Sequence, residues 1–405
     1  MKRALLVILA TVLVALGGGY AWWHHRTAPA GTPQAVELAQ AELPERLTAA
    51  TVLAVGEATH GTADFREAWR LIALQAAGKG FSTIVMEENA GSTSQVDAWL
   101  QGGPGTAEQA ANRFGFRLNR TRETAQLLTS LREWNQAHPQ QAVHLYGLDM
   151  QRPVQDRDVV LAWLQRVDPQ AARRHGPQLT GITDDTAYDA GAGARFKPLV
   201  GALLADVEAA AAGRSDDATL RARLSARTLA QGIERAAVGV SGYDRDADLH
   251  ANLDLLVQQR AKAGGEHALM LAHDAHVSRV ALSKVPGSHL GVLNAQRWGE
   301  HYRVIGADAH HVRLQDGGQV HSFDVRSPVR GIFRGTTIGF LDLGKATQEN
   351  RELLARRVPL TAGGSPFQSW AAWVPFFHQV SVVHQQAWDA LVYVEDSRPT
   401  TPLPR

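Results

Sequence analysis

The chain has 405 residues, of which 44% are hydrophobic and 20% are charged, so it has ample apolar material for a globular core. Its formal net charge is +1 and its Lys and Arg residues form no long basic run, which counts against a nucleic acid partner. The absence of cysteine excludes disulfides, thiolate nucleophiles and cysteine-bound zinc.

The N-terminal segment has the pattern of a membrane anchor. Residues 4–23 carry no charge, are long enough to span a bilayer, and end in aromatic residues that suit its interface. Lys2 and Arg3 favour a cytoplasmic N-terminus, which would place the body on the outer, periplasmic side of a bacterial-type inner membrane. Residues 1–26 are therefore predicted to be an anchor. The alternative is a cleaved signal that sends the protein to the periplasm.

The next segments predict an α/β arrangement. Residues 27–44 are expected to form a linker, and residues 45–405 one large domain. This domain begins with an apolar strand at 51–55, a helix at 64–77 and a second strand at 82–86. A strand–helix–strand unit of this size requires parallel pairing with a right-handed crossover.

The remainder of the chain adds strands to this sheet and one helical insertion. The insertion is expected at about 154–262, where it covers one face of the sheet, and the tail after residue 396 is expected to run over the surface. Further strands are predicted at 142–148, 268–272, 302–305, 335–341 and 390–394, and insertion helices at 154–167, 196–212 and 218–238, with a loop at 175–193.

Ionisable residues follow the ends of four predicted strands. Because the carboxyl ends of parallel strands meet at one edge of a sheet, these side chains are expected to converge where open α/β sheets bind ligands. A single such residue is commonly a turn or helix cap, but four strands in succession share the pattern. The residues concerned are Glu57, His60, Glu87, Glu88, Asp149, His273 and His276.

Histidines, carboxylates and arginines allow two kinds of chemistry at this edge. A histidine can deprotonate water while a carboxylate orients it and a cation stabilises an oxyanion. The same groups can instead hold Zn, Mn or Fe. The sequence has no Gly-x-Ser-x-Gly elbow and no phosphate-binding glycine motif after a strand, so neither a serine hydrolase nor a nucleotide-binding protein is indicated.

Several motifs in order along the chain resemble those of the erythromycin esterase family. The similarity covers roughly residues 45–400. The motifs are Gly-Glu-Ala-Thr-His-Gly at 56–61, Tyr-Gly-Leu-Asp-Met-Gln at 146–151, Arg-Asp at 245–246, Ala-His-Asp-Ala-His at 272–276 and Trp-Asp-Ala-Leu at 388–391.

The resemblance implies an α/β fold with a central, largely parallel sheet, flanking helices, and the helical insertion as one wall of a deep cleft. It implies hydrolysis of an ester or lactone by activated water, without a resident cofactor and without a covalent acyl-enzyme. His60 matches the general base of the family. Glu57, Glu87 and His273 match the other site residues, and His273 is expected to be protonated and to donate to the oxyanion.

The arginine of the family falls on Trp69 in this chain, and Arg70 follows it. Arg70 is therefore expected to stabilise the oxyanion, with Arg66 one turn away as the other candidate. The predicted substrate-binding residues are Arg66, Asp149, His276 and Arg245.

Two alternatives to a metal-free esterase remain open from the sequence. One is a metal-dependent hydrolase that uses the same histidines and carboxylates. The other is a non-catalytic envelope protein that binds a glycan or lipid. The family implies a macrolide substrate, but an outward-facing, anchored relative need not meet one.

The anchor prediction can be tested by cell fractionation. Full-length protein is expected to stay with the membranes after a carbonate wash, because residues 4–23 would span the bilayer. Release of full-length protein into the soluble fraction would contradict the anchor, and release of a shortened chain would indicate a cleaved signal.

Overall fold

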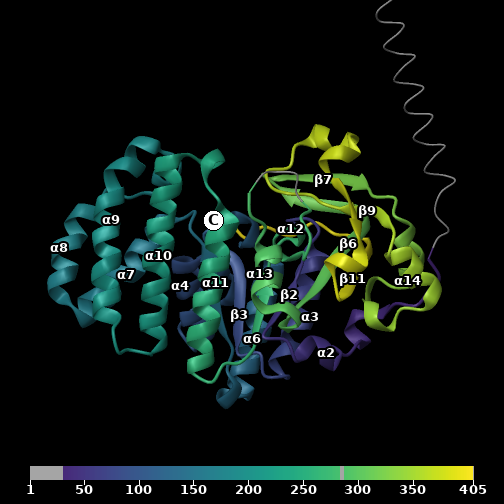
Figure 1. The fold of residues 1–405 in the computed structure, drawn as a ribbon, viewed down its shortest axis with the longest axis horizontal. Coiled ribbons are helices and arrows are strands. Elements are labelled where there is room, and N and C mark those ends of the chain that lie inside the picture. Colours follow the sequence, from purple (N-terminus) through teal and green to yellow (C-terminus); the bar gives the residue numbers. More distant parts are fainter. Residues whose placement is uncertain (1–30, 283–286, 405) are drawn as a thin grey trace, which may run out of the picture.

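The computed structural model describes residues 31–282 and 287–404, which form one nine-stranded sheet and a separate two-stranded ribbon (Figure 1). The order across the large sheet is β1-β8-β11-β6-β2-β5-β3-β4, and β7 pairs with β6 off this path. Its strands are β1 (Val36–Glu37), β2 (Val52–Val55), β3 (Thr83–Asn89), β4 (His144–Asp149), β5 (Ala268–Leu271), β6 (Tyr302–Asp316), β7 (Gln319–Asp324), β8 (Ile338–Asp342) and β11 (Ala390–Asp396); the ribbon is β9 (Arg357–Thr361) and β10 (Gln379–Val383).

The predicted α/β class and largely parallel sheet are confirmed. The strands β11, β6, β2, β5, β3 and β4 are parallel to one another, whereas β8, β1 and β7 pair antiparallel with their neighbours. The central strands β2 and β5 are buried along their whole length, as expected for strands that helices cover on both faces. The four strands predicted to end in ionisable residues are neighbours in the order β2-β5-β3-β4.

Alternate residues of these strands enter two separate cores, one on each face of the sheet. Leu53 and Val55 of β2 pack against α3 and α6, whereas Val52 and Ala54 contribute to the core that contains α11 and α13. The helices on the first face are α3 (Ala63–Ala77), α4 (Ala90–Leu100), α5 (Ala107–Ala111) and α6 (Arg122–Ala137). Those in or beside the second core are α11 (Arg245–Lys262), α12 (Asp274–Val277), α13 (Leu290–Trp298), α14 (Gln348–Leu354) and α15 (His384–Ala387).

The helical insertion has its own hydrophobic core. Its helices gather at one end of the molecule, beside β3 and α11, while β6, β7 and β9 lie at the other end (Figure 1). They are α7 (Pro153–Val167), α8 (Pro169–Leu179), α9 (Ala190–Ala211) and α10 (Asp217–Val238).

The predicted loop at 175–193 is partly wrong. Helix α8 continues through Gly176 and Pro177 to Leu179, and a 3-10 helix, η4, covers Asp184–Tyr188. Asp168 caps α8, and the buried side chains of the helix pack into the insertion core. Tertiary burial therefore outweighs the helix-breaking tendency of these residues.

The described part of the predicted linker, and the tail after residue 396, both pack against the domain more than the sequence predicts. Within the predicted linker 27–44, Val36 and Glu37 pair with β8, and Leu38 is fully buried. In the tail, Thr400 and Leu403 are buried, and Arg398 pairs with Asp64 at the start of α3. The tail therefore belongs to the domain and reaches the carboxyl edge of the sheet.

Within residues 31–282 and 287–404, no helix has the length and apolar character needed to cross a bilayer. The predicted anchor at residues 1–26 lies outside the described part of the chain.

Gly56, which follows β2, allows a close approach to α12. A Cβ atom at this position would lie 1.7 Å from Oδ1 of the buried Asp274. The Gly56→Ala variant is therefore expected to lose about 1–3 kcal/mol of unfolding free energy through overpacking. Urea denaturation measures this loss. The control is Gly201→Ala on α9, where a Cβ meets nothing within 4 Å and alanine favours the helix. Equal stabilities of the two variants would contradict this packing.

Candidate active site

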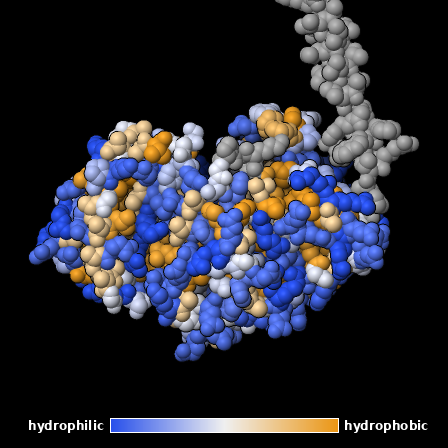
Figure 2. Space-filling view, in the orientation of Figure 1, coloured by the Kyte–Doolittle hydropathy of each residue, from blue (hydrophilic) through white to orange (hydrophobic). Residues whose placement is uncertain are grey.

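A cleft of about 770 Å³ opens at the carboxyl edge of the sheet. Residues of the sheet core, such as His60 and His273, line it together with Arg152 and Tyr188 from the insertion side. Thr400 and Pro402 of the tail also line it. The space-filling view shows a notch in the outline between the two ends of the molecule (Figure 2). The insertion therefore forms one wall of a cleft, as the sequence predicts.

Glu57 and His60 form a hydrogen-bonded pair after β2. The Nδ1 atom of His60 lies 2.7 Å from Oε1 of Glu57, which is almost completely buried. Because a carboxylate oxygen accepts, Nδ1 carries the proton in this pair. The Nε2 atom of the neutral His60 ring is then the nitrogen with a free lone pair, and His60 lines the cleft. This arrangement is that of an oriented general base.

Arg66 lies behind this pair and does not line the cleft. Its Nη2 atom donates to Oε1 of Glu57 at 3.1 Å, and its guanidinium lies 4.2 Å from the ring centre of Trp69. Both Arg66 and Glu57 are 1% exposed. Contrary to the prediction, Arg66 therefore does not face a substrate but forms an ion pair that holds the carboxylate of Glu57 in place.

Arg70 is not brought to the cleft. On α3 it pairs with Glu67, through bonds of 2.6 and 2.7 Å, and it contacts Ser130 of α6. Arg66 and Arg70 are four residues apart, so Arg70 lies about one turn further along α3. There it bonds Glu67 and Ser130, whereas Arg66 reaches Glu57. The prediction that Arg70 stabilises the oxyanion is wrong in this geometry.

His273 lies beside His60 at the start of α12. The two ring centres are 4.8 Å apart. Nδ1 of His273 accepts from the backbone N–H of Ala275, so the proton of the neutral ring is on Nε2, which is buried and has no partner in the described part of the chain. Burial and the neighbouring His60 lower the pKa of His273 to about 4. The expected protonated His273 is therefore wrong, and the ring offers a neutral N–H donor.

Glu87, Arg245 and His276 form a charged network on the same cleft. Arg245 donates to Oε1 of Glu87 at 2.9 Å and to the buried Asp149 at 2.7 Å. Nε2 of His276 lies 3.3 Å from Oε1 of Glu87, and its Nδ1 bonds Asp246. Asp149 does not line the cleft, so it positions Arg245 and does not face a substrate. Glu87, Arg245 and His276 do line it, as predicted.

The network fixes the charges of its members. Burial opposes ionisation of Glu87, but His276 and Arg245 hold its pKa well below its usual range. Burial also opposes charge on His276, yet Glu87 and Asp246 raise its pKa to about 10. His276 is therefore cationic at neutral pH while His273 is neutral. Opposite pKa shifts of two nearby histidines are typical of active sites in which one group acts as an acid and another as a base.

Asp246 is a site residue that the sequence-based prediction did not include. It accepts from the backbone N–H of Leu290 at 2.9 Å and holds His276 from the side opposite Glu87. Its position next to Arg245 in the Arg-Asp motif was the available signal. No signal in the sequence placed Thr400 or Pro402 at the cleft, because they reach it only through the fold of the tail.

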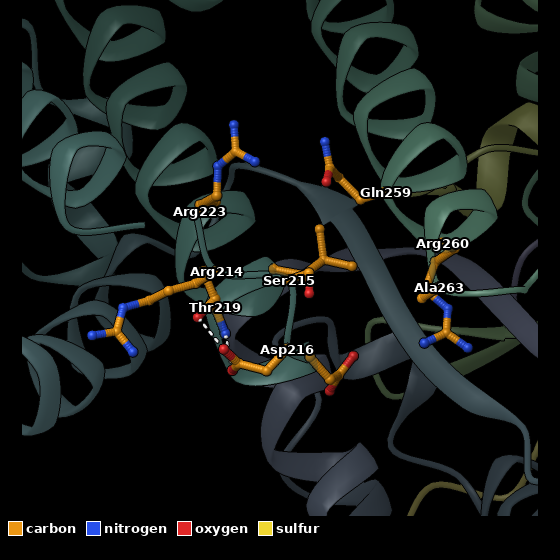
Figure 3. Close-up of a pocket in the computed structure, with 10 residues that line it drawn as sticks. Arg214, Ser215, Asp216, Thr219, Arg223, Gln259, Arg260 and Ala263 are labelled. Carbon is orange, nitrogen blue, oxygen red and sulfur yellow. Dashed lines mark hydrogen bonds between the residues drawn. The ribbon is translucent and has the colours of Figure 1, made fainter. Parts of the chain in front are cut away.

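A second, smaller pocket of about 80 Å³ lies between the start of α10 and the end of α11 (Figure 3). Asp216 caps α10 by accepting from Thr219, and the arginines of the pocket bond neighbouring groups, such as Arg223 with Glu208. The pocket contains no histidine and therefore lacks the acid–base set of the cleft.

Among the described residues, Asp97, His144 and Asp217 form the one group with ligand atoms close enough together for a metal ion. Arg221 already lies between its carboxylates, with bonds of 2.6 Å to Asp97 and 2.5 Å to Asp217. This guanidinium supplies the positive charge, so the group fits an ion pair better than a metal site. None of these residues lines the cleft.

The fold and the cleft define an α/β protein with a histidine–carboxylate site of the kind that hydrolases use. The family model described as erythromycin esterase matches residues 76–397, and the chain belongs to the erythromycin esterase family. Glu57 and His60 precede the matched range, so their assignment depends on the geometry described above. No curated protein matches the chain.

Solved structures share the fold over nearly the whole chain. A Bacillus cereus protein has a TM-score of 0.73 at 19% identity and covers 95% of this chain and 98% of its own. A succinoglycan biosynthesis protein has a TM-score of 0.73 at 14% identity, with 92% and 96% covered. A histidine mutant of the erythromycin esterase EreC in its open conformation has a TM-score of 0.66 at 16% identity, with 91% and 98% covered. Identities this low show the fold alone.

The charge of His276 is expected to stabilise the fold in a pH-dependent manner. Its folded pKa, about 10, lies above the unfolded value of about 6.5, so its stabilisation is complete below the unfolded value and is lost as pH rises through about 10. The difference in melting temperature between wild type and His276→Gln should therefore shrink from pH 6 to pH 10.5. The exposed His301 provides the control, and His301→Gln should show no such trend. A constant difference for His276→Gln would contradict the assigned charge.

Proposed function

We propose that the protein hydrolyses a carboxylic ester or lactone with a water molecule that His60 deprotonates. The observation that carries the proposal is the buried Glu57–His60 pair at the edge of the cleft, 4.8 Å from the ring of His273. Membership of the erythromycin esterase family supports an ester bond as the target.

In this mechanism, Nε2 of His60 takes a proton from water while the oxygen attacks the carbonyl carbon. The Nδ1 proton stays on His60 and is donated to Oε1 of Glu57, whose charge stabilises the imidazolium that forms. The tetrahedral intermediate then expels the alkoxide, which receives the proton from His60. An ester yields an acid and an alcohol, and a lactone yields both groups in one molecule.

The oxyanion of the intermediate requires donors that are already in place. His273 offers a neutral Nε2–H, and the cationic His276 and Arg245 line the same cleft. Glu87 supports all three, because it accepts from the backbone N–H of His273 and pairs with the other two side chains. Glu87 therefore acts as a positioning residue.

A macrolide lactone is the substrate that the family name suggests, and a macrolide-esterase-like activity is part of the proposal. The only evidence for the location of the protein is the uncharged segment 4–23, and on this basis we propose that the cleft faces the periplasm. An enzyme on that side of the membrane would meet esters other than macrolides, so a substrate panel should include both.

His60→Asn is expected to fold normally and to lose about 10²–10⁴-fold in kcat/KM, because the general base is removed. The kcat/KM of the Glu57→Gln variant should also fall steeply, because a neutral amide cannot stabilise the imidazolium. Hydrolysis of a panel of esters and lactones measures both effects, and circular dichroism checks the fold. The control His301→Asn changes an exposed histidine outside the cleft.

Wild-type rates in His60→Asn would remove His60 from the mechanism. Loss of wild-type activity in a chelator would instead favour the metal-dependent reading of the same side chains. Absence of hydrolysis of every ester and lactone would favour a binding protein.

A further inference from the structure

The insertion side of the cleft carries positive charge that the hydrolytic mechanism does not use. Arg117, in the 3-10 helix η2 (Arg117–Asn119), and Arg152, at the start of α7, both line the cleft. Arg120 lies directly behind them, where its guanidinium donates to the backbone oxygens of Phe114 and Gly115. We refer to Arg117, Arg120 and Arg152 as the arginine wall.

The arginine wall is built on a buried carboxylate. Glu88, the residue after Glu87 on β3, accepts from the backbone N–H groups of Gly115 and Phe116 and from the side chain of Asn119. These bonds fix the loop that carries Arg117. Glu87 and Glu88 are consecutive on β3, so their side chains point to opposite sides of the strand. Glu87 therefore lines the cleft while Glu88 holds the loop.

The arginines are close to one another because Gly115 lies between them. A Cβ atom at Gly115 would lie only 2.9 Å from Cγ of Arg152, so the stem of Arg152 packs directly on this loop. Burial lowers the pKa of Arg120, the charges of Arg152 and Arg117 add to this lowering, and the charges of Glu88 and Asp184 oppose it. Three guanidinium groups are thus held together on one wall.

Few negative charges balance this wall. Among the described residues, Arg117 forms no ion pair, and Arg152 has only one, a separation of 3.7 Å to Asp184. The Nε atom of Arg152 is buried and has no hydrogen-bond partner within residues 31–282 and 287–404. Glu88 faces Arg120 and does not line the cleft, and burial raises its pKa to about 7. By contrast, Arg245 on the same cleft pairs closely with both Glu87 and Asp149.

We propose that the arginine wall binds an anionic group of the substrate, so that the preferred ester carries a carboxylate or phosphate on the part that faces η2 and α7. The inference rests on the proposed ester hydrolysis. Guanidinium groups bind both anions through paired N–H donors, and the unpartnered Nε of Arg152 is such a donor. Phe116 and Tyr188 line the cleft beside the arginines and can contact the apolar chain that connects the anion to the ester.

The test compares two chromogenic esters of equal chain length, 4-nitrophenyl pentanoate and the 4-nitrophenyl half-ester of glutarate. Wild-type protein is expected to prefer the anionic half-ester. In the Arg117→Gln/Arg152→Gln double variant, the ratio of kcat/KM for the anionic to the neutral ester should fall on the order of ten- to a hundredfold, as expected for lost charge-assisted hydrogen bonds. The matched control is Arg173→Gln, which removes an exposed arginine of α8 outside the cleft and should leave both rates unchanged.

A second readout does not depend on turnover. Isothermal titration of glutarate into full-length wild type and the double variant should show binding that weakens by a similar factor in the variant and at high salt. Inorganic phosphate as a competitor distinguishes a phosphate site from a carboxylate site.

The outcomes separate the two proposals. Equal or faster cleavage of the neutral ester by wild type would overturn the anionic preference and leave the hydrolase intact. If neither ester is cleaved but glutarate binds through the two arginines, the anion site stands and the proposed ester hydrolysis fails. If glutarate does not bind wild type, or binds the double variant equally well, the anion site is wrong.

Discussion

The site depends on one carboxylate that two side chains share. Glu57 stands at the end of the central strand β2, where it holds Nδ1 of His60 on one side and the guanidinium of Arg66 on the other. All three lie within ten residues of sequence, and the pair of Glu57 and Arg66 is almost completely buried. Removing one member of a buried ion pair costs roughly 3–5 kcal/mol, so Arg66 keeps Glu57 in place and Glu57 in turn orients His60.

The charged network around Glu87 has a second purpose, because it joins α11 and α12 to the sheet. Arg245 is the first residue of α11, yet its partners Glu87 and Asp149 stand on β3 and β4. His276 connects α12 to Glu87 and to Asp246 of α11. The walls of the cleft are therefore held together by the same groups that set its charge. A change in this network would alter both the shape of the cleft and its electrostatics.

The cleft is divided into a reacting side and a cationic side by adjacent glutamates. Glu87 is paired with cations and lines the cleft, whereas Glu88 is buried and holds the loop of Arg117 through backbone N–H groups. The two roles follow from their adjacent positions on β3, because successive side chains of a strand point to opposite sides. Arg117 and Arg152 line the same cleft as His60 and, in the proposed mechanism, bind the substrate without taking part in the proton transfer.

The sequence by itself determined the sheet and the edge at which the site forms. Apolar runs set the central strands, and their carboxyl ends carry Glu57, Glu87, Asp149 and His273, so convergence follows from parallel pairing alone. The structure decided which arginine belongs to Glu57, because Arg66 and Arg70 stand one turn apart on α3 and only Arg66 reaches this carboxylate. It also decided the charge of His273, the role of Asp246, and the approach of Arg117, Arg152 and Thr400 to the cleft. Burial, pKa shifts and contacts between distant segments are properties of three-dimensional packing, so no local pattern of residues specifies them.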